Sequence, residues 1–154
     1  MTSLFVVLAF LLPWSLWRQM HVHEVTRRGL TRLPVIFAAI GLFGLQRSDI
    51  PSTTAAAVAM AVSLALSIGL GVARGAVIPV WRDERGRWLS QGNRLTSALW
   101  VVLIGAKFAL GAVASVTGWF PQTSAGEVFL FLAVSFAVQN RMVARRVARA
   151  GVPA

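Results

Sequence analysis

Residues 53–73 read TTAAAVAMAVSLALSIGLGVA, and this stretch decides the class of fold. It has no charged side chain, and as a helix rising about 1.5 Å per residue it is long enough to cross a hydrocarbon core roughly 30 Å thick. Residues 95–118 form a second apolar run of full membrane length. Three shorter runs, which need polar ends or local thinning of the bilayer to cross it, lie at residues 3–17, 33–45 and 125–140. The sequence therefore predicts an all-α integral membrane protein, a bundle of five transmembrane helices in one domain over residues 1–154.

The composition agrees with lipid as the main solvent of this chain. Hydrophobic residues make up 56% of it and charged residues only 13%, whereas soluble domains average about 25% charged residues. There is no cysteine, which excludes disulfides, thiolate catalysis and cysteine-ligated zinc, and we expect no cofactor. The net charge is +10, but the basic residues fall between apolar runs. We therefore expect anionic lipid headgroups as partners of the arginine-rich loops, and no nucleic acid.

The basic residues also predict the orientation of the chain. Arginines are frequent before residue 33, between residues 73 and 95, and in the tail after residue 140. The connector at 46–52 has one arginine, and the connector at 119–124 has none. Because arginine-rich loops stay in the cytoplasm, we expect a multi-pass protein of the cytoplasmic membrane with its N-terminus outside and its C-terminus inside. The run at 3–17 lacks the basic start and cleavage site of a signal peptide, so we expect it to be retained.

Small residues recur at every fourth position along the stretch quoted above. On a helix this spacing makes one face with little bulk, which lets another backbone approach closely. We favour packing against a neighbouring helix of the same chain. A homodimer seam, or a cavity wall bearing hydroxyl groups, is the alternative. The face consists of Ala55, Ala59, Ser63, Ser67, Gly71 and Gly75.

A charged loop, VIPVWRDERGRWLSQGNRLT at residues 77–96, separates the two longest runs. Asp83 and Gly86 suit the first and fourth positions of a type I turn, so the flanking residues could pair as a short β-hairpin at the cytoplasmic interface. Asn93 or Thr96 would cap the helix that follows. We favour a loop that lies along the membrane surface over a gate or a docking surface.

The segment HVHE, His21 to Glu24, precedes the second apolar run. Histidines two positions apart share a face on a strand, but no third ligand accompanies them, so we expect no metal site. We expect this segment to contact solvent or lipid headgroups. Glu24 could act as a general acid, although we favour an ion pair with a nearby arginine.

The single lysine of the chain, Lys107, lies almost at the midpoint of the run at residues 95–118. A charge at that depth costs roughly 2.5–3.5 kcal/mol. We expect no acidic partner, because the closest acids, Asp49 and Glu127, lie at the outer ends of runs. Three interpretations are open: a cavity that holds water or an anion, a structural lysine bonded to carbonyls and hydroxyls or across a dimer, and a catalytic amine. The groups that could surround the ammonium are Trp100, Gly111, Ser115, Ser63, Ser67, Ser135 and Gln139, of which Gly111 would leave space beside it.

Two stretches of the chain match a known pattern: residues 73–108, ARGAVIPVWRDERGRWLSQGNRLTSALWVVLIGAKF, and a last span ending in AVQNRMVARR at 137–146. In these stretches the chain resembles the CcdC-like family of small bacterial integral membrane proteins. The resemblance implies about five spans in a bacterial inner membrane and draws attention to the basic residue within the fourth span, but it implies no reaction. The positions that carry it are Arg74, Trp81, Arg82, Asp83, Gly86 and Lys107.

Three functions follow from these features as hypotheses. The first is a non-enzymatic membrane protein that binds or passes a small anionic or amphipathic ligand in a cavity around Lys107. We expect it to be a homo-oligomer, because five short helices enclose little volume. The second is a membrane enzyme acting on a lipid or an isoprenoid, with Glu24, Asp49 and Glu127 as its acid-base groups. The third is a structural or regulatory subunit that uses the small-residue face and the basic loops.

Overall fold

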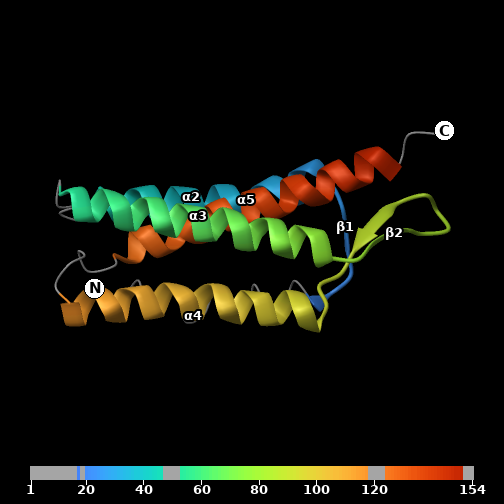
Figure 1. Ribbon diagram of the computed structural model, residues 1–154. Coiled ribbons are helices and arrows are strands. Elements are labelled where there is room, and N and C mark those ends of the chain that lie inside the picture. Colours follow the sequence, from blue (N-terminus) through green and yellow to red (C-terminus); the bar gives the residue numbers. More distant parts are fainter. Residues whose placement is uncertain (1–16, 18–19, 47–52, 118–123, 151–154) are drawn as a thin grey trace.

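A computed structural model describes residues 17, 20–46, 53–117 and 124–150 of this chain. Four long helices dominate it: α2 (Arg27–Leu45), α3 (Thr54–Val77), α4 (Arg94–Thr117) and α5 (Ala125–Ala150), which lie side by side (Figure 1). Each is long and apolar enough to cross a membrane. The mostly helical architecture expected from the sequence is therefore confirmed, and four helices among the described residues suit a membrane by length and composition. The expected first span at residues 3–17 lies, apart from Trp17, outside the described residues.

Hydroxyl and amide side chains define where the helices begin. Thr26 Oγ1 accepts the backbone N–H of Gly29 at 3.1 Å at the start of α2, and Thr53 caps α3 in the same way. Asn93 and Thr96 cap α4 together, because each side chain accepts the backbone N–H of the other, at 2.8 and 2.7 Å. These bonds satisfy donors that a helix start leaves without partners.

Two helices extend beyond their predicted spans. The second begins at Arg27 instead of residue 33, and the last continues from residue 140 to Ala150. Hydropathy marks only the part of a helix that suits lipid, whereas backbone hydrogen bonding continues into the polar region. The basic tail of α5 has a packing role there, since Arg146 Nη1 donates to the carbonyl oxygens of Gly75, Ala76 and Ile78 at 2.7–3.2 Å. A cation at those carbonyls complements the negative end of the α3 dipole.

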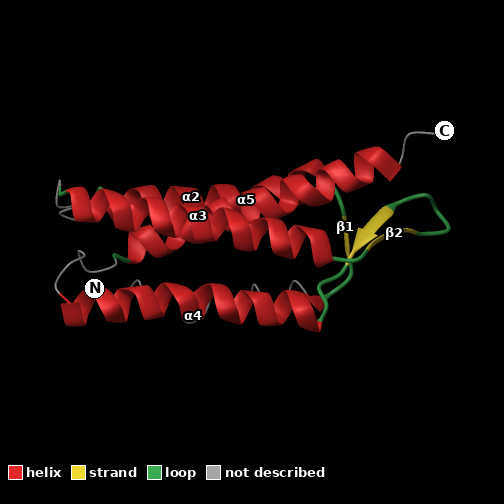
Figure 2. Cartoon of the chain, in the orientation of Figure 1, coloured by secondary structure: helices red, strands yellow, loops and turns green. Residues whose placement is uncertain are grey.

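A small antiparallel sheet covers one end of the bundle (Figure 2). Its strands are β1 (His23–Glu24), β2 (Val80–Arg82) and β3 (Trp88–Ser90), in the order β1-β3-β2. The turn between β2 and β3 has Gly86 at a φ of 77°, in the left-handed region that glycine adopts without strain. The sequence placed a turn at this point but did not predict that the segment before α2 would add a third strand.

Hydrogen bonds within that turn stabilise the ionised form of Asp83. Its Oδ1 accepts the backbone N–H of Arg87 at 2.7 Å, and its Oδ2 accepts the Arg87 guanidinium at 2.9 Å. The backbone hydrogen bond from Arg87, reinforced by its side chain, lowers the pKa of Asp83 below its usual value. The carboxylate is therefore part of the turn's structure at neutral pH.

Helix α5 is the centre of the packing. It runs antiparallel to α2, and Phe37 of α2 stacks on Phe129 and Phe136 of α5 with ring centroids 5.8 and 5.5 Å apart. The two backbones approach closely near the start of α5, where a Cβ on Gly126 would lie 2.6 Å from the backbone nitrogen of Leu45. The buried hydrophobic core consists of Phe37, Trp100, Leu103, Phe129, Phe131, Leu132, Ala133 and Phe136.

The small-residue face of α3 packs against α5. Ser67 Oγ donates to the backbone oxygen of Phe131 at 2.5 Å. A Cβ on Gly71 would lie 2.7 Å from the Ser135 backbone oxygen, and one on Gly75 would lie 2.6 Å from Met142 Cβ. From Ser67 to Gly75 this face therefore contacts α5 of the same chain, while Ser63 accepts a hydrogen bond from Lys107 of α4. Ala55 and Ala59, earlier on the same face, are half-buried.

Candidate functional site

Lys107 lies in a closed polar contact between three helices. Its side chain is only 4% exposed, and its Nζ donates to Ser63 Oγ of α3 at 3.0 Å. The same nitrogen forms an ion pair with the carboxylate of Glu127 on α5. The ring of Phe131 adds a cation–π contact at 5.6 Å. The ammonium thus has a charge partner, a hydroxyl acceptor and an aromatic face.

The expectation that Lys107 has no acidic partner is wrong. From the sequence, we expected Glu127 to lie at the outer end of its span, far from the middle of α4. In Figure 1, however, the orange beginning of α5 lies short of the end of α4, so the first turn of α5 is set back into the bundle. A residue of that turn can therefore meet the middle of α4. This contact favours the structural interpretation of Lys107, because the protein itself neutralises the charge that an anion would otherwise meet.

The other groups expected around Lys107 have different roles. Ser67 bonds to the α5 backbone, as described above, and Trp100 is buried about two turns away from Lys107, toward the sheet. Ser135 and Gln139 are buried farther along α5. Gly111 is half-buried in α4, and the side chain of Ser115 lies outside the described part of the chain.

A buried arginine, Arg74, was not singled out by sequence reasoning as a site of its own. It is fully buried in the last turn of α3, with its guanidinium 5.2 Å from the ring of Phe136 and 6.0 Å from that of Trp100. The available signal was its spacing: Arg74 follows Gly71 by three residues and therefore shares the packed face of α3.

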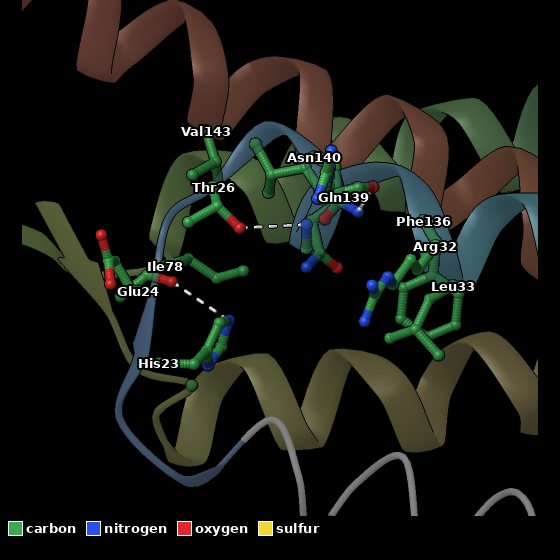
Figure 3. Close-up of a pocket in the computed structure, with 15 residues that line it drawn as sticks. His23, Glu24, Thr26, Arg32, Leu33, Ile78, Phe136, Gln139, Asn140 and Val143 are labelled. Carbon is green, nitrogen blue, oxygen red and sulfur yellow. Dashed lines mark hydrogen bonds between the residues drawn. The ribbon is translucent and has the colours of Figure 1, made fainter.

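A cavity of about 360 Å³ lies where the sheet meets α2 and α5 (Figure 3). Its apolar wall includes Leu33 of α2, Ile78 after α3, and Phe136 and Val143 of α5. Lys107 does not line it. The cavity thus combines an apolar wall inside the bundle with polar residues of the sheet, and the sequence did not predict it.

The polar lining of the cavity is basic. Arg28 and Arg32, one turn apart on α2, line it together with Glu24, but Glu24 is shared with Arg87, whose guanidinium lies 4.0 Å from it. Figure 3 shows Arg32 directed toward the middle of the cavity, facing His23 across it. Two guanidinium groups and one shared carboxylate favour an anionic ligand.

Two amides on α5 form another side of the cavity. Asn140 Nδ2 donates to the backbone oxygen of Leu30 at 2.5 Å, which fixes α2 against α5. Gln139 is 6% exposed, and its Oε1 accepts no hydrogen bond from the described residues. A buried polar atom of this kind is costly, and a bound water or ligand group could satisfy it.

A histidine and a serine meet at the sheet edge of the same cavity. The β1–β3 register places His23 opposite Ser90, and His23 Nε2 lies 3.2 Å from Ser90 Oγ. His21, in contrast, contacts the Trp17 ring and the Trp17 backbone oxygen. Among the described residues, no three His, Cys, Asp or Glu side chains are grouped closely enough to hold a metal ion.

The three acids considered for an enzyme are not brought together. Glu24 pairs with Arg87 at the sheet, whereas Glu127 pairs with Lys107 at the middle of α4, away from the sheet. Asp49 lies outside the described residues. Because Glu24 and Glu127 are far apart, the described residues contain no acid-base centre that uses both of them.

Neither a protein-family model, nor a curated protein, nor a solved structure matches this chain.

Proposed function

We propose that this chain is a multi-pass membrane protein that binds a small anionic, amphipathic ligand in the cavity between the sheet, α2 and α5. The sequence analysis expected the same class of ligand, small and anionic or amphipathic, but around Lys107. We now propose that it binds in this cavity instead. The anionic group would meet Arg28 and Arg32, and the apolar part would lie against Leu33 and Phe136.

One observation carries this proposal: the basic and the apolar linings belong to one cavity. A ligand pocket of this size needs a few polar groups that fix orientation and an apolar wall that contributes burial. A lipid with an anionic headgroup has a charged part that suits the arginines and an adjoining apolar part that suits the apolar wall. If the arginine-rich end faces the cytoplasm, as we propose from the loop charges, the headgroup side of the cavity lies at the inner leaflet.

Binding of short-chain lipids to the purified protein in maltoside micelles tests the proposal. Dihexanoyl phosphatidylglycerol should bind at least ten times more tightly than dihexanoyl phosphatidylcholine, because its headgroup has a net negative charge. Arg32→Gln should weaken binding of the anionic lipid about ten-fold, or about 1.4 kcal/mol. Arg145→Gln is the matched control, since this arginine is exposed on α5 and does not line the cavity. Equal affinity for the two lipids, or an equal loss in both variants, would contradict the proposal.

The orientation and the oligomeric state stay proposals as well. A topology reporter fused after Ala154 should be active in the cytoplasm, and an extracellular signal would reverse the assignment. We also propose that the protein is a homo-oligomer. The part of the α3 face that α5 covers would not contribute to the contact between subunits. Exposed apolar side chains of α4, such as Val101 and Phe108, are the surface for lipid or for a second copy. The mass of the protein in a neutral detergent would distinguish the two.

A further inference from the structure

We propose that Ser90 and His23 are a nucleophile and its general base, and that the chain hydrolyses a carboxylic ester of an anionic amphiphile bound in the cavity. This inference rests on the proposed binding function and assigns a reaction to the same site. It uses none of the acids considered above as catalytic groups.

The distance between the two side chains suits proton transfer. His23 Nε2 lies 3.2 Å from Ser90 Oγ, at the long end of the hydrogen-bond range in which a base activates a serine. Ser90 is 3% exposed and lines the cavity with His23. Its hydroxyl is thus shielded from bulk water but lies on the wall that a bound ligand would contact.

A third group sets the tautomer of the histidine. His23 Nδ1 lies 3.0 Å from the backbone oxygen of His21. A carbonyl oxygen can only accept, so we assign the ring proton of the neutral imidazole to Nδ1. Nε2 is then the acceptor, and the hydroxyl of Ser90 donates to it. This tautomer is the one that a general base needs when it takes the proton of a serine.

The layout of the cavity indicates which bond would react. Figure 3 shows Arg32 and His23 on opposite sides of the cavity. A ligand with its anionic group at Arg28 and Arg32 therefore presents the adjoining part of the molecule to Ser90. In a glycerophospholipid or a lysophospholipid, a carboxylic ester lies there, between the headgroup and the acyl chain. The apolar wall of Ile78 and Phe136 can accept that chain.

The reaction consists of two balanced steps with water as the second substrate. Ser90 Oγ attacks the ester carbonyl carbon while its proton passes to His23 Nε2. The carbon–oxygen bond to the alcohol then breaks, and the leaving alkoxide takes that proton, which leaves an acyl-serine. Water next attacks the acyl group, with His23 accepting its proton and returning it to Ser90 Oγ. The products are a carboxylic acid and an alcohol that retains the anionic group.

A structural role for the same pair makes different predictions. Opposed residues on neighbouring strands often form a hydrogen bond that only stabilises the sheet. Such a serine reacts no faster than other serines with an electrophile. Covalent labelling therefore separates the two roles without requiring a mutant that folds.

The decisive experiment is labelling of the purified wild-type protein with an alkyl fluorophosphonate, followed by trypsin digestion and mass spectrometry. Cleavage after Arg87 and Arg94 releases the peptide WLSQGNR, in which Ser90 is the single serine. We expect the label on this peptide, and we expect labelling to slow about a hundred-fold or more in His23→Gln. Ser97→Ala should label at the wild-type rate, since this hydroxyl bonds to the backbone oxygen of Asn93.

The same preparation is tested for binding and for hydrolysis of dihexanoyl phosphatidylglycerol. Labelled Ser90 together with release of hexanoate that Ser90→Ala abolishes supports the inference. Absence of label on this peptide, with anionic lipid still bound, overturns the inference and leaves the proposed binding function in place. Absence of both label and binding overturns both. Release of hexanoate that persists in Ser90→Ala assigns the activity to another group and also overturns the inference.

Discussion

Removal of the carboxylate beside Lys107 gives the sharpest test of the bundle's packing. Glu127→Gln leaves the ammonium, 4% exposed, with neutral hydrogen-bond acceptors only, namely Ser63 and the new amide oxygen. Breaking a buried ion pair by deleting one partner costs about 3–5 kcal/mol. Glu127 is 22% exposed, and the Ser63 bond persists, so we expect the lower end, about 3 kcal/mol or roughly two powers of ten in the unfolding equilibrium.

The assay is reversible unfolding in mixed micelles with increasing SDS, followed by circular dichroism and tryptophan fluorescence. Glu84→Gln is the control, because that acid is exposed in the turn between β2 and β3. The double variant Lys107→Met with Glu127→Gln removes both charges. It should recover most of the loss, since apolar or neutral replacements of a whole buried pair are often tolerated.

The double-mutant cycle makes the reasoning refutable. We expect a coupling energy of about 2 kcal/mol between Lys107 and Glu127, larger than the roughly 0.5 kcal/mol found for independent sites. If Glu127→Gln matched the Glu84→Gln control, or if the two single losses simply added, the ion pair would not hold α4 to α5. The alternative interpretation, in which Lys107 lines a cavity that holds water or an anion, would then be favoured.

Three further predictions concern packing, capping and pH. Gly71→Ala should destabilise the protein by about 1–3 kcal/mol, because the new Cβ would lie 2.7 Å from a backbone oxygen of α5, whereas Gly69→Ala, with nothing within 4 Å, should be neutral or stabilising in the same SDS assay. Arg146→Ala should cost about 1–2 kcal/mol by releasing the α3 carbonyls, and Arg146→Lys should recover part of this; equal losses would argue against the cap. The Arg87 backbone N–H lowers the pKa of Asp83, so its stabilisation of the turn is complete above about pH 4 and is lost as the pH falls through the native pKa. Amide chemical shifts of the turn should follow this loss in the wild type and stay flat in Asp83→Asn.

Much of the helical architecture follows directly from the sequence. The apolar run at 53–73 and the run at 95–118 differ from α3 and α4 by a few residues, because length and hydropathy alone decide whether a helix suits lipid. The small residues of α3 also identified a packed face, since their spacing matches the helical period. These features depend on local composition and need no knowledge of neighbours.

The polar contacts of the candidate sites could not be predicted in this way. They depend on how deep each residue lies in the bundle and on partners that are far away in the sequence. Glu127 meets Lys107 because α5 starts inside the bundle, and that start is fixed by the close approach of Gly126 to the end of α2. No periodicity encodes how two helix ends align. Ser90 and His23 meet through a strand pairing across 67 positions, and two-residue strands such as β1 are too short for any alternation to be recognised.

The origin of the cavity walls has a consequence for how the protein is made. Its lining comes from residues 23–33, then from residues 78–92, and last from residues 136–143. The ribosome adds about 5–20 residues per second, so roughly 5–20 s separate synthesis of the first and last walls. During that interval Arg28 and Arg32 lack the α5 side of their pocket. A partner that binds these arginines on the nascent chain, or anionic lipid itself, would compete with the final helix, and assembly of the site becomes a step that follows membrane insertion.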